Sequence, residues 1–141
     1  MTPASIEKSI ERVRAICRAL PNAVESGGVA SGVGALSGTR VVGFKVSSRV
    51  FARMFVVDAP DGREVVVLWV RADPEEREVL LRTGHPYFPA GPREVGIVLD
   101  ARTDWTEIPE LVTESYLLMA PKKLAAEVDA SIRAQQIDGD A

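Results

Sequence analysis

The chain has 141 residues, with 17 Lys and Arg against 20 Asp and Glu, so its formal net charge is −3. At 46% hydrophobic and 26% charged residues, the composition is that of an ordinary globular protein, and the length suits one domain with its own core. No apolar stretch approaches the ~20 residues that span a bilayer, and the N-terminus lacks the pattern of an export signal. We therefore expect no membrane segment and a cytoplasmic location. A single cysteine and a single histidine exclude an internal disulfide and a Cys/His zinc cluster, so we expect no metal and no cofactor.

Apolar residues from Ile6 to Leu20 recur at helical spacing, which predicts a first helix that ends near Pro21. Residues 26–38 hold five of the eleven glycines, together with three serines, and we expect them to form a flexible crossover into a sheet. Gly27 and Gly32 have the separation of a phosphate-binding loop, but Val33 stands where that loop needs lysine. This segment is therefore interpreted as a plain loop.

The middle of the chain changes to a period of two and predicts three antiparallel strands, at 41–46, 49–57 and 63–70, in a meander. Asp73 then supplies an N-cap, Pro74 a first helical residue and Glu76 a capping-box carboxylate, which predicts a short helix that stops at Gly84. A strand of about six residues follows at 95–100.

Two helices joined at Pro121 close the predicted domain, and residues 134–141 are expected to form a frayed tail. The fold class is therefore α+β, with an antiparallel sheet flanked by helices in a single domain over residues 1–133 and a flexible C-terminal tail at 134–141.

No set of residues predicts catalysis. Cys17 and His85 form the only conceivable thiol–imidazole pair, yet Cys17 lies on the apolar stripe of the first helix, where a buried structural cysteine is expected. The pairs Glu75/Glu76 and Glu110/Glu114 lie where helix N-termini and exposed faces favour negative charge. We therefore expect no catalytic residue and no enzymatic activity.

Charge is distributed unevenly along the chain. Residues 1–57 carry eight basic against three acidic side chains, and residues 58–141 carry nine against seventeen. No acid lies between Glu25 and Asp58, and four cations, Arg40, Lys45, Arg49 and Arg53, lie on or beside the first predicted hairpin. Along its second strand, Arg49, Phe51, Arg53 and Phe55 alternate with other residues and are expected on one side. Cations interleaved with aromatic rings on a β-ribbon are typical of a nucleic-acid surface. The alternative is that these cations protect an edge strand and pair with the acidic second half.

Several segments in order resemble the MmcQ/YjbR family. The C-terminal part carries V-L-D at 98–100, Trp105, E-L at 110–111 and T-E-S-Y-L-L-M-A-P-K-K-L at 113–124. Upstream, F-K-V-S-S-R-V-F-A at 44–52 is similar to the hairpin pattern F-x-V-x-G-K-x-F-A of that family, with Ser48 in place of the turn glycine and Arg49 in place of the lysine. The segment D-P-E-E at 73–76 and Phe88-Pro89 fit the same order, so the resemblance extends over roughly residues 8–130.

The resemblance implies a compact α+β domain similar to the secretion-chaperone architecture, and a double-wing DNA-binding protein without catalytic residues. We expect Arg40, Lys45, Arg49 and Arg53 to contact phosphates and Phe51 or Phe55 to act as a wedge. Binding through four cations on an acidic chain would be weak and salt-sensitive. The alternative hypothesis is a protein- or peptide-binding module, with a homodimer as one form of it.

Overall fold

A computed structural model of the chain describes residues 3–29 and 39–139. Its elements follow the order α1 (Pro3–Arg18), β1 (Val24–Val29), β2 (Arg40–Val46), β3 (Arg49–Asp58), β4 (Glu64–Arg71), α2 (Pro74–Thr83), β5 (Tyr87–Pro89), β6 (Glu94–Leu99), α3 (Glu107–Met119) and α4 (Lys122–Gly139). The fold is therefore α+β, as the sequence predicts.

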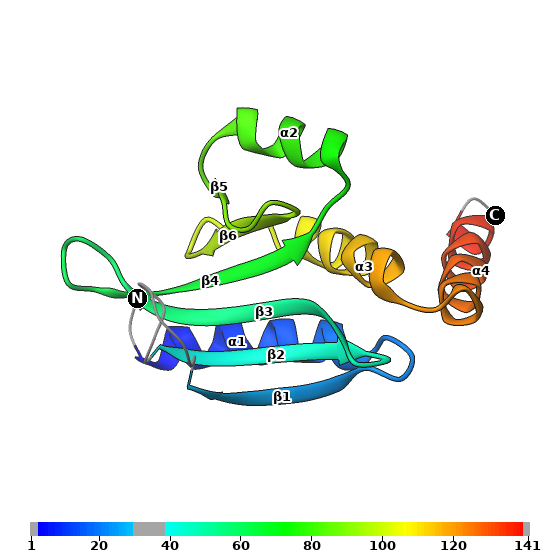
Figure 1. Cartoon of the computed structure of the whole chain (residues 1–141), viewed down its shortest axis with the longest axis horizontal. Coiled ribbons are helices and arrows are strands. Elements are labelled where there is room, and N and C mark those ends of the chain that lie inside the picture. Colours follow the sequence, from blue (N-terminus) through cyan, green and yellow to red (C-terminus); the bar gives the residue numbers. More distant parts are fainter. Residues whose placement is uncertain (1–2, 30–38, 140–141) are drawn as a thin grey trace.

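The strands form one antiparallel sheet in the order β1-β2-β3-β4-β6-β5 (Figure 1). The predicted meander is confirmed, because β2, β3 and β4 are consecutive neighbours. Helices α1 and α3 pack against β3 and β4, and α2 packs against β5 and β6. The layered arrangement of α1 behind β2 and β3 is visible in Figure 1.

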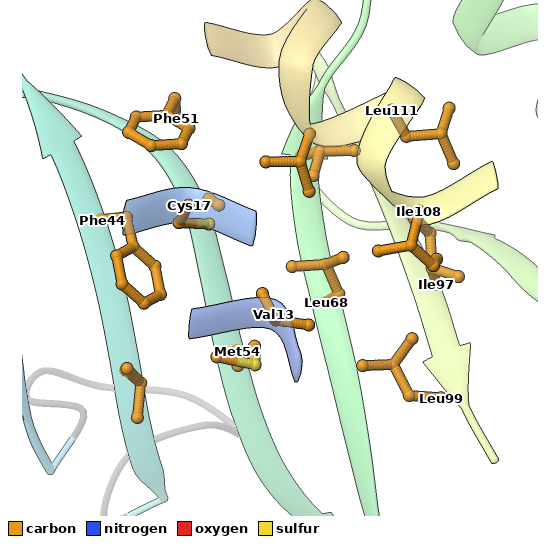
Figure 2. Close-up of a cluster of buried hydrophobic side chains, with 14 of the residues drawn as sticks. Val13, Cys17, Phe44, Phe51, Met54, Leu68, Ile97, Leu99, Ile108 and Leu111 are labelled. Carbon is orange, nitrogen blue, oxygen red and sulfur yellow. The ribbon is translucent and has the colours of Figure 1, made fainter. Parts of the chain in front are cut away.

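The core lies between the sheet and the two helices α1 and α3. Figure 2 shows Val13 and Cys17 of α1 facing Phe44, Met54 and Leu68 on three successive strands, with residues of β6 and α3 beyond them. Alternate residues of β2, β4 and β6 contribute to this layer, as a half-buried sheet requires. The apolar stripe of α1 is therefore used for packing, as its helical spacing predicts.

Two neighbouring side chains of α3 fasten this helix to the rest of the fold. The hydroxyl of the fully buried Ser115 accepts a hydrogen bond from the Arg71 backbone N–H at 2.8 Å and donates one to the Phe51 carbonyl at 2.5 Å. The Tyr116 hydroxyl donates to the Pro21 carbonyl at 2.7 Å, and its ring meets Phe51 edge-on, with 5.3 Å between centroids. These contacts hold the start of β3, close to the turn of the β2–β3 hairpin.

The short helix α2 begins and ends as the sequence predicts. The Asp73 carboxylate accepts hydrogen bonds from the backbone N–H groups of Glu75 and Glu76, Pro74 is the first helical residue, and Gly84 ends the helix at a φ of 79°. Only a residue that tolerates positive φ fits this C-terminal position, which favours glycine. The break between α3 and α4 falls at Ala120 and Pro121, and it is also as predicted.

Three local predictions are corrected. Residues 24–29 form strand β1, although residues 26–29 were expected to lie in a loop; pairing with β2 overrides the low strand propensity of Ser26 and the glycines. The remainder of that loop, residues 30–38, lies outside the described residues. The three-residue edge strand β5 was not predicted, because it is too short to show a period. Helix α4 continues to Gly139, so residues 134–139, expected in the frayed tail, are helical.

Within the described ranges, no helix is long and apolar enough to cross a membrane.

Candidate nucleic-acid interface

Two exposed cations flank the turn between β2 and β3. Ser47 and Ser48 form this two-residue turn with φ values of 50° and 67°, the signature of a turn whose twist matches that of the flanking strands. Lys45 precedes the turn and Arg49 follows it, and both are exposed. Neither makes an ion pair with any acid in the described part of the chain. The tip of the hairpin is therefore a free positive site.

A bulge in β3 breaks the alternation that the sequence suggests. Phe44 pairs with Ala52 whereas Lys45 pairs with Val50, so Phe51 is an extra residue without a partner on β2. Phe51 and Ala52 both join the core, and Phe51 is only 1% exposed. The prediction that Arg49, Phe51, Arg53 and Phe55 share one side is therefore wrong. Phe51 packs on Tyr116 and has no surface to offer as a wedge.

Arg40 is engaged within the protein. Its guanidinium donates to the Glu7 carboxylate of α1, with 2.5 Å between Nη1 and Oε1. The hydrogen bond from Arg40 lowers the pKa of Glu7, and the same bond raises the pKa of Arg40. Glu7 belongs to the basic first part of the chain, so the expected pairing of Arg40 with an acid of residues 58–141 is wrong. Arg40 thus has an acid partner, which the other three cations lack among the described residues.

Arg53 and Phe55 lie on the sheet face that points away from the core. Arg53 pairs in register with Gly43 and Trp69, is half-buried, and lines a shallow hollow of about 190 Å³ beside β1. The ring of Phe55 lies against Trp69 with 4.8 Å between centroids, and only 4% of Phe55 is exposed. Phe55 is therefore a packing residue in the structure, while Arg53 lines the hollow and makes no ion pair with an acid among the described residues.

Three of the six predicted residues remain as cations without an ion pair among the described residues. In the register of β2 and β3, Lys45 lies on the same sheet face as Gly43 and Arg53, whereas Arg49 pairs with the buried Val46 and so starts on the opposite face, beside the turn. Arg40 is neutralised by Glu7, and both aromatic rings are buried. The candidate interface, hereafter the basic hairpin, consists of Lys45, Arg49 and Arg53.

Sequence reasoning missed one carboxyl pair. Glu76 of α2 and Glu114 of α3 lie within hydrogen-bonding reach of each other, although they were considered only within the pairs Glu75/Glu76 and Glu110/Glu114. The hydrogen bond to Glu114, together with partial burial and its charge, raises the pKa of Glu76 to about 7. No sequence spacing links residues 38 positions apart, so only the docking of α2 near α3 reveals this contact.

Cys17 and His85 lie in different surroundings, one buried and one exposed. Cys17 is fully buried in the core, and burial raises the pKa of its thiol to about 12. His85 is exposed, with its Nε2 atom 3.9 Å from the Asp100 carboxylate. Within the described residues, no group of three His, Cys, Asp or Glu side chains could hold a metal ion.

Comparison with known proteins identifies one family. The family model named YjbR matches residues 28–118, which is more than half of the 141 residues. The matched segment begins at the end of β1, includes the basic hairpin, and ends within α3; helices α1 and α4 lie outside it. No curated protein and no solved structure shows a significant match.

Proposed function

Because the chain belongs to the YjbR family, we propose that it is a DNA-binding protein without catalytic activity, which holds phosphates with the basic hairpin. The observation that carries the proposal is the pair of exposed cations on either side of the Ser47–Ser48 turn, neither of which pairs with an acid in the part of the chain that the structure describes. A two-residue turn makes a narrow tip, and guanidinium and ammonium groups on it can reach phosphates on a duplex from either strand. The buried Cys17 thiol supports a binding role over nucleophilic catalysis.

The proposed binding is independent of DNA sequence. Readout of a base requires side chains that enter a groove and pair with base edges, and the basic hairpin offers long cations and two small serines instead. Phe51 and Phe55 are packed within the protein and cannot wedge between base pairs without loss of their contacts. Contacts to phosphates alone account for the expected weak affinity.

The number of free cations sets the expected salt dependence. Three phosphate contacts release about three counterions, so the slope of log K against log salt is expected to be about −2.7 on duplex DNA. Four contacts, with Arg40 included, would give about −3.6. The slope therefore distinguishes the three-cation surface from the four-cation surface that the sequence alone suggests.

Fluorescence anisotropy with a labelled duplex, at salt concentrations from about 50 to about 200 mM, tests the proposal. Arg49→Gln should flatten the slope by about 0.9 and weaken binding to unrelated duplexes equally. Arg102→Gln is the matched control, since Arg102 is an equally exposed arginine on the loop before α3, and its slope should not change. Absence of binding at about 50 mM salt, or equal effects of the two variants, would refute the basic hairpin as a DNA interface.

A protein- or peptide-binding module is the second candidate. The observation that favours it is the position of β1 at one edge of the sheet, where no other strand of the described residues pairs with its outer side. Such an edge can accept a strand from a peptide or a second copy of the chain. Size-exclusion chromatography beside the DNA titration separates the two candidates: a dimer that does not bind DNA would favour the module.

A further inference from the structure

A second hollow lies away from the basic hairpin. This cavity of about 710 Å³ is bounded by α1 and by the end of the sheet where β4 begins and β6 ends. Lys8, Ser9 and Arg12 of α1 form one wall, and Arg63 before β4 and Trp105 before α3 contribute to the others. Its volume falls within the range of about 300–1,000 Å³ that is typical of small-molecule sites.

The wall of the cavity is positively charged, although the chain as a whole is acidic. Three cations, Lys8, Arg12 and Arg63, face one acid, Asp100. One Asp100 oxygen already accepts the Arg102 backbone N–H at 2.8 Å, and Arg63 is held by Asp61, with 2.6 Å between Nη2 and Oδ2. Lys8 makes no ion pair with an acid in the described ranges. A surplus of positive charge is therefore left to face the cavity.

Arg12 is held in place by an aromatic ring instead of a carboxylate. Its guanidinium carbon lies 4.6 Å from the centre of the Trp105 ring. A guanidinium that stacks on an indole keeps the N–H groups at its edge available for hydrogen bonds. The ring also restricts the conformations of the Arg12 side chain before a ligand binds, so less conformational entropy is lost on binding. This arrangement presents a fork of donors that matches two oxygens of a phosphate.

Lys8 and Arg12 stand four residues apart on α1, so they project side by side from one face of the helix. Ser9 is buried and lines the same cavity. Two cations and a hydroxyl-bearing residue of one helix therefore line the cavity, and Arg63 lines it from the loop before β4.

We infer that this cavity binds a small molecule that carries more than one phosphate group. Phosphate is favoured because the donors are a guanidinium fork, an ammonium and a hydroxyl, which together suit several anionic oxygens. A molecule with a single phosphate would leave most of the volume and one of the cations unused. Size and charge thus fit a diphosphate or a phosphorylated metabolite of nucleotide size.

This site is distinct from the basic hairpin. The β2–β3 turn lies at one end of strand β3 and the turn before Arg63 lies at the other, because consecutive antiparallel strands connect at alternate ends (Figure 1). The ten residues of β3 extend about 33 Å between the two turns. Loss of DNA binding at the hairpin would therefore leave this inference intact.

Inorganic pyrophosphate is the probe, and Trp105 supplies the signal. The chain has two tryptophans, and Trp69→Phe removes the one that does not line the cavity. Titration of pyrophosphate into this variant, against potassium chloride of equal ionic strength, should give a saturable change in emission. Calorimetry on the unaltered chain should give one bound pyrophosphate per chain. Because Trp69 is intact there, this measurement does not depend on any effect of the Trp69→Phe substitution on folding.

Substitutions then locate the site. Lys8→Gln in the Trp69→Phe background should weaken pyrophosphate binding about ten- to a hundredfold, as expected for loss of one charged hydrogen bond. Lys123→Gln removes the same charge from an exposed position on α4 and should leave the affinity within about twofold. No saturable signal up to about 10 mM pyrophosphate, or equal losses in both lysine variants, would overturn the inference.

Discussion

Ser115→Ala tests the contact that fastens α3 to the sheet. The substitution removes a hydroxyl that satisfies both the Arg71 N–H and the Phe51 carbonyl, at 2.8 and 2.5 Å. Ser115 is fully buried, and each polar group left unpaired inside a protein costs about 1–3 kcal/mol. Part of that cost is offset because the variant no longer buries a hydroxyl. We therefore expect the free energy of unfolding to fall by about 2–4 kcal/mol.

Urea denaturation followed by circular dichroism measures this loss as a lower midpoint with an unchanged slope. Thr83→Val is the control, because the Thr83 hydroxyl donates to the Val79 carbonyl on an exposed turn of α2 and should contribute less than about 0.5 kcal/mol. A loss below about 0.5 kcal/mol for Ser115→Ala would show that the Arg71 and Phe51 groups find other partners. The role of Ser115 in fixing the bulge of β3 would then be refuted.

Three further predictions concern other parts of the fold. The Cys17 thiol, whose pKa burial raises to about 12, should react with a thiol reagent in the native protein far more slowly than in urea; rapid labelling near neutral pH would contradict its burial. The pKa of Glu76 is raised from 4.5 to about 7, so ionisation of Glu76 should destabilise the fold as pH rises through this range. Glu76→Gln should therefore raise the free energy of unfolding at pH 8 by about 1 kcal/mol after solvent screening, and by little near pH 4. Thermal melts at the two pH values measure this difference. Gly96→Ala would place a Cβ atom 2.2 Å from the Phe88 ring, so the ring must move and the free energy of unfolding should fall by about 1–3 kcal/mol. Gly27→Ala is the control, because its added Cβ would lie 3.5 Å from the Val41 carbonyl oxygen, an ordinary contact, and should have a smaller effect in the same denaturation assay.

Local chemistry made parts of the fold predictable. The capping residues Asp73 and Pro74 and the stop at Gly84 define α2 without reference to the rest of the chain, and Pro121 defines the break between α3 and α4. The strands of the meander follow from a period of two. These signals act over a few residues, so a single sequence contains them in full.

The candidate site was less predictable, because it depends on contacts between distant residues. The alternation from Arg49 to Phe55 looked like one continuous face, and only the pairing with β2 reveals the bulge that turns Phe51 into the core. Likewise, Arg40 and Glu7 are 33 positions apart, and their ion pair follows from the way α1 packs beside β2. Such contacts are set by tertiary packing and leave no pattern in the local sequence.

The most direct test of the basic hairpin is the salt dependence of DNA binding after Arg40 is released. Glu7→Gln removes the acid that holds Arg40, so a fourth cation should join Lys45, Arg49 and Arg53. The slope of log K against log salt should then steepen from about −2.7 to about −3.6. Glu11→Gln removes an acid from the same helix, one that pairs with Arg14 instead, and should leave the slope unchanged. A slope near zero for the unaltered chain, or no steepening in Glu7→Gln, would contradict binding through free cations on this hairpin.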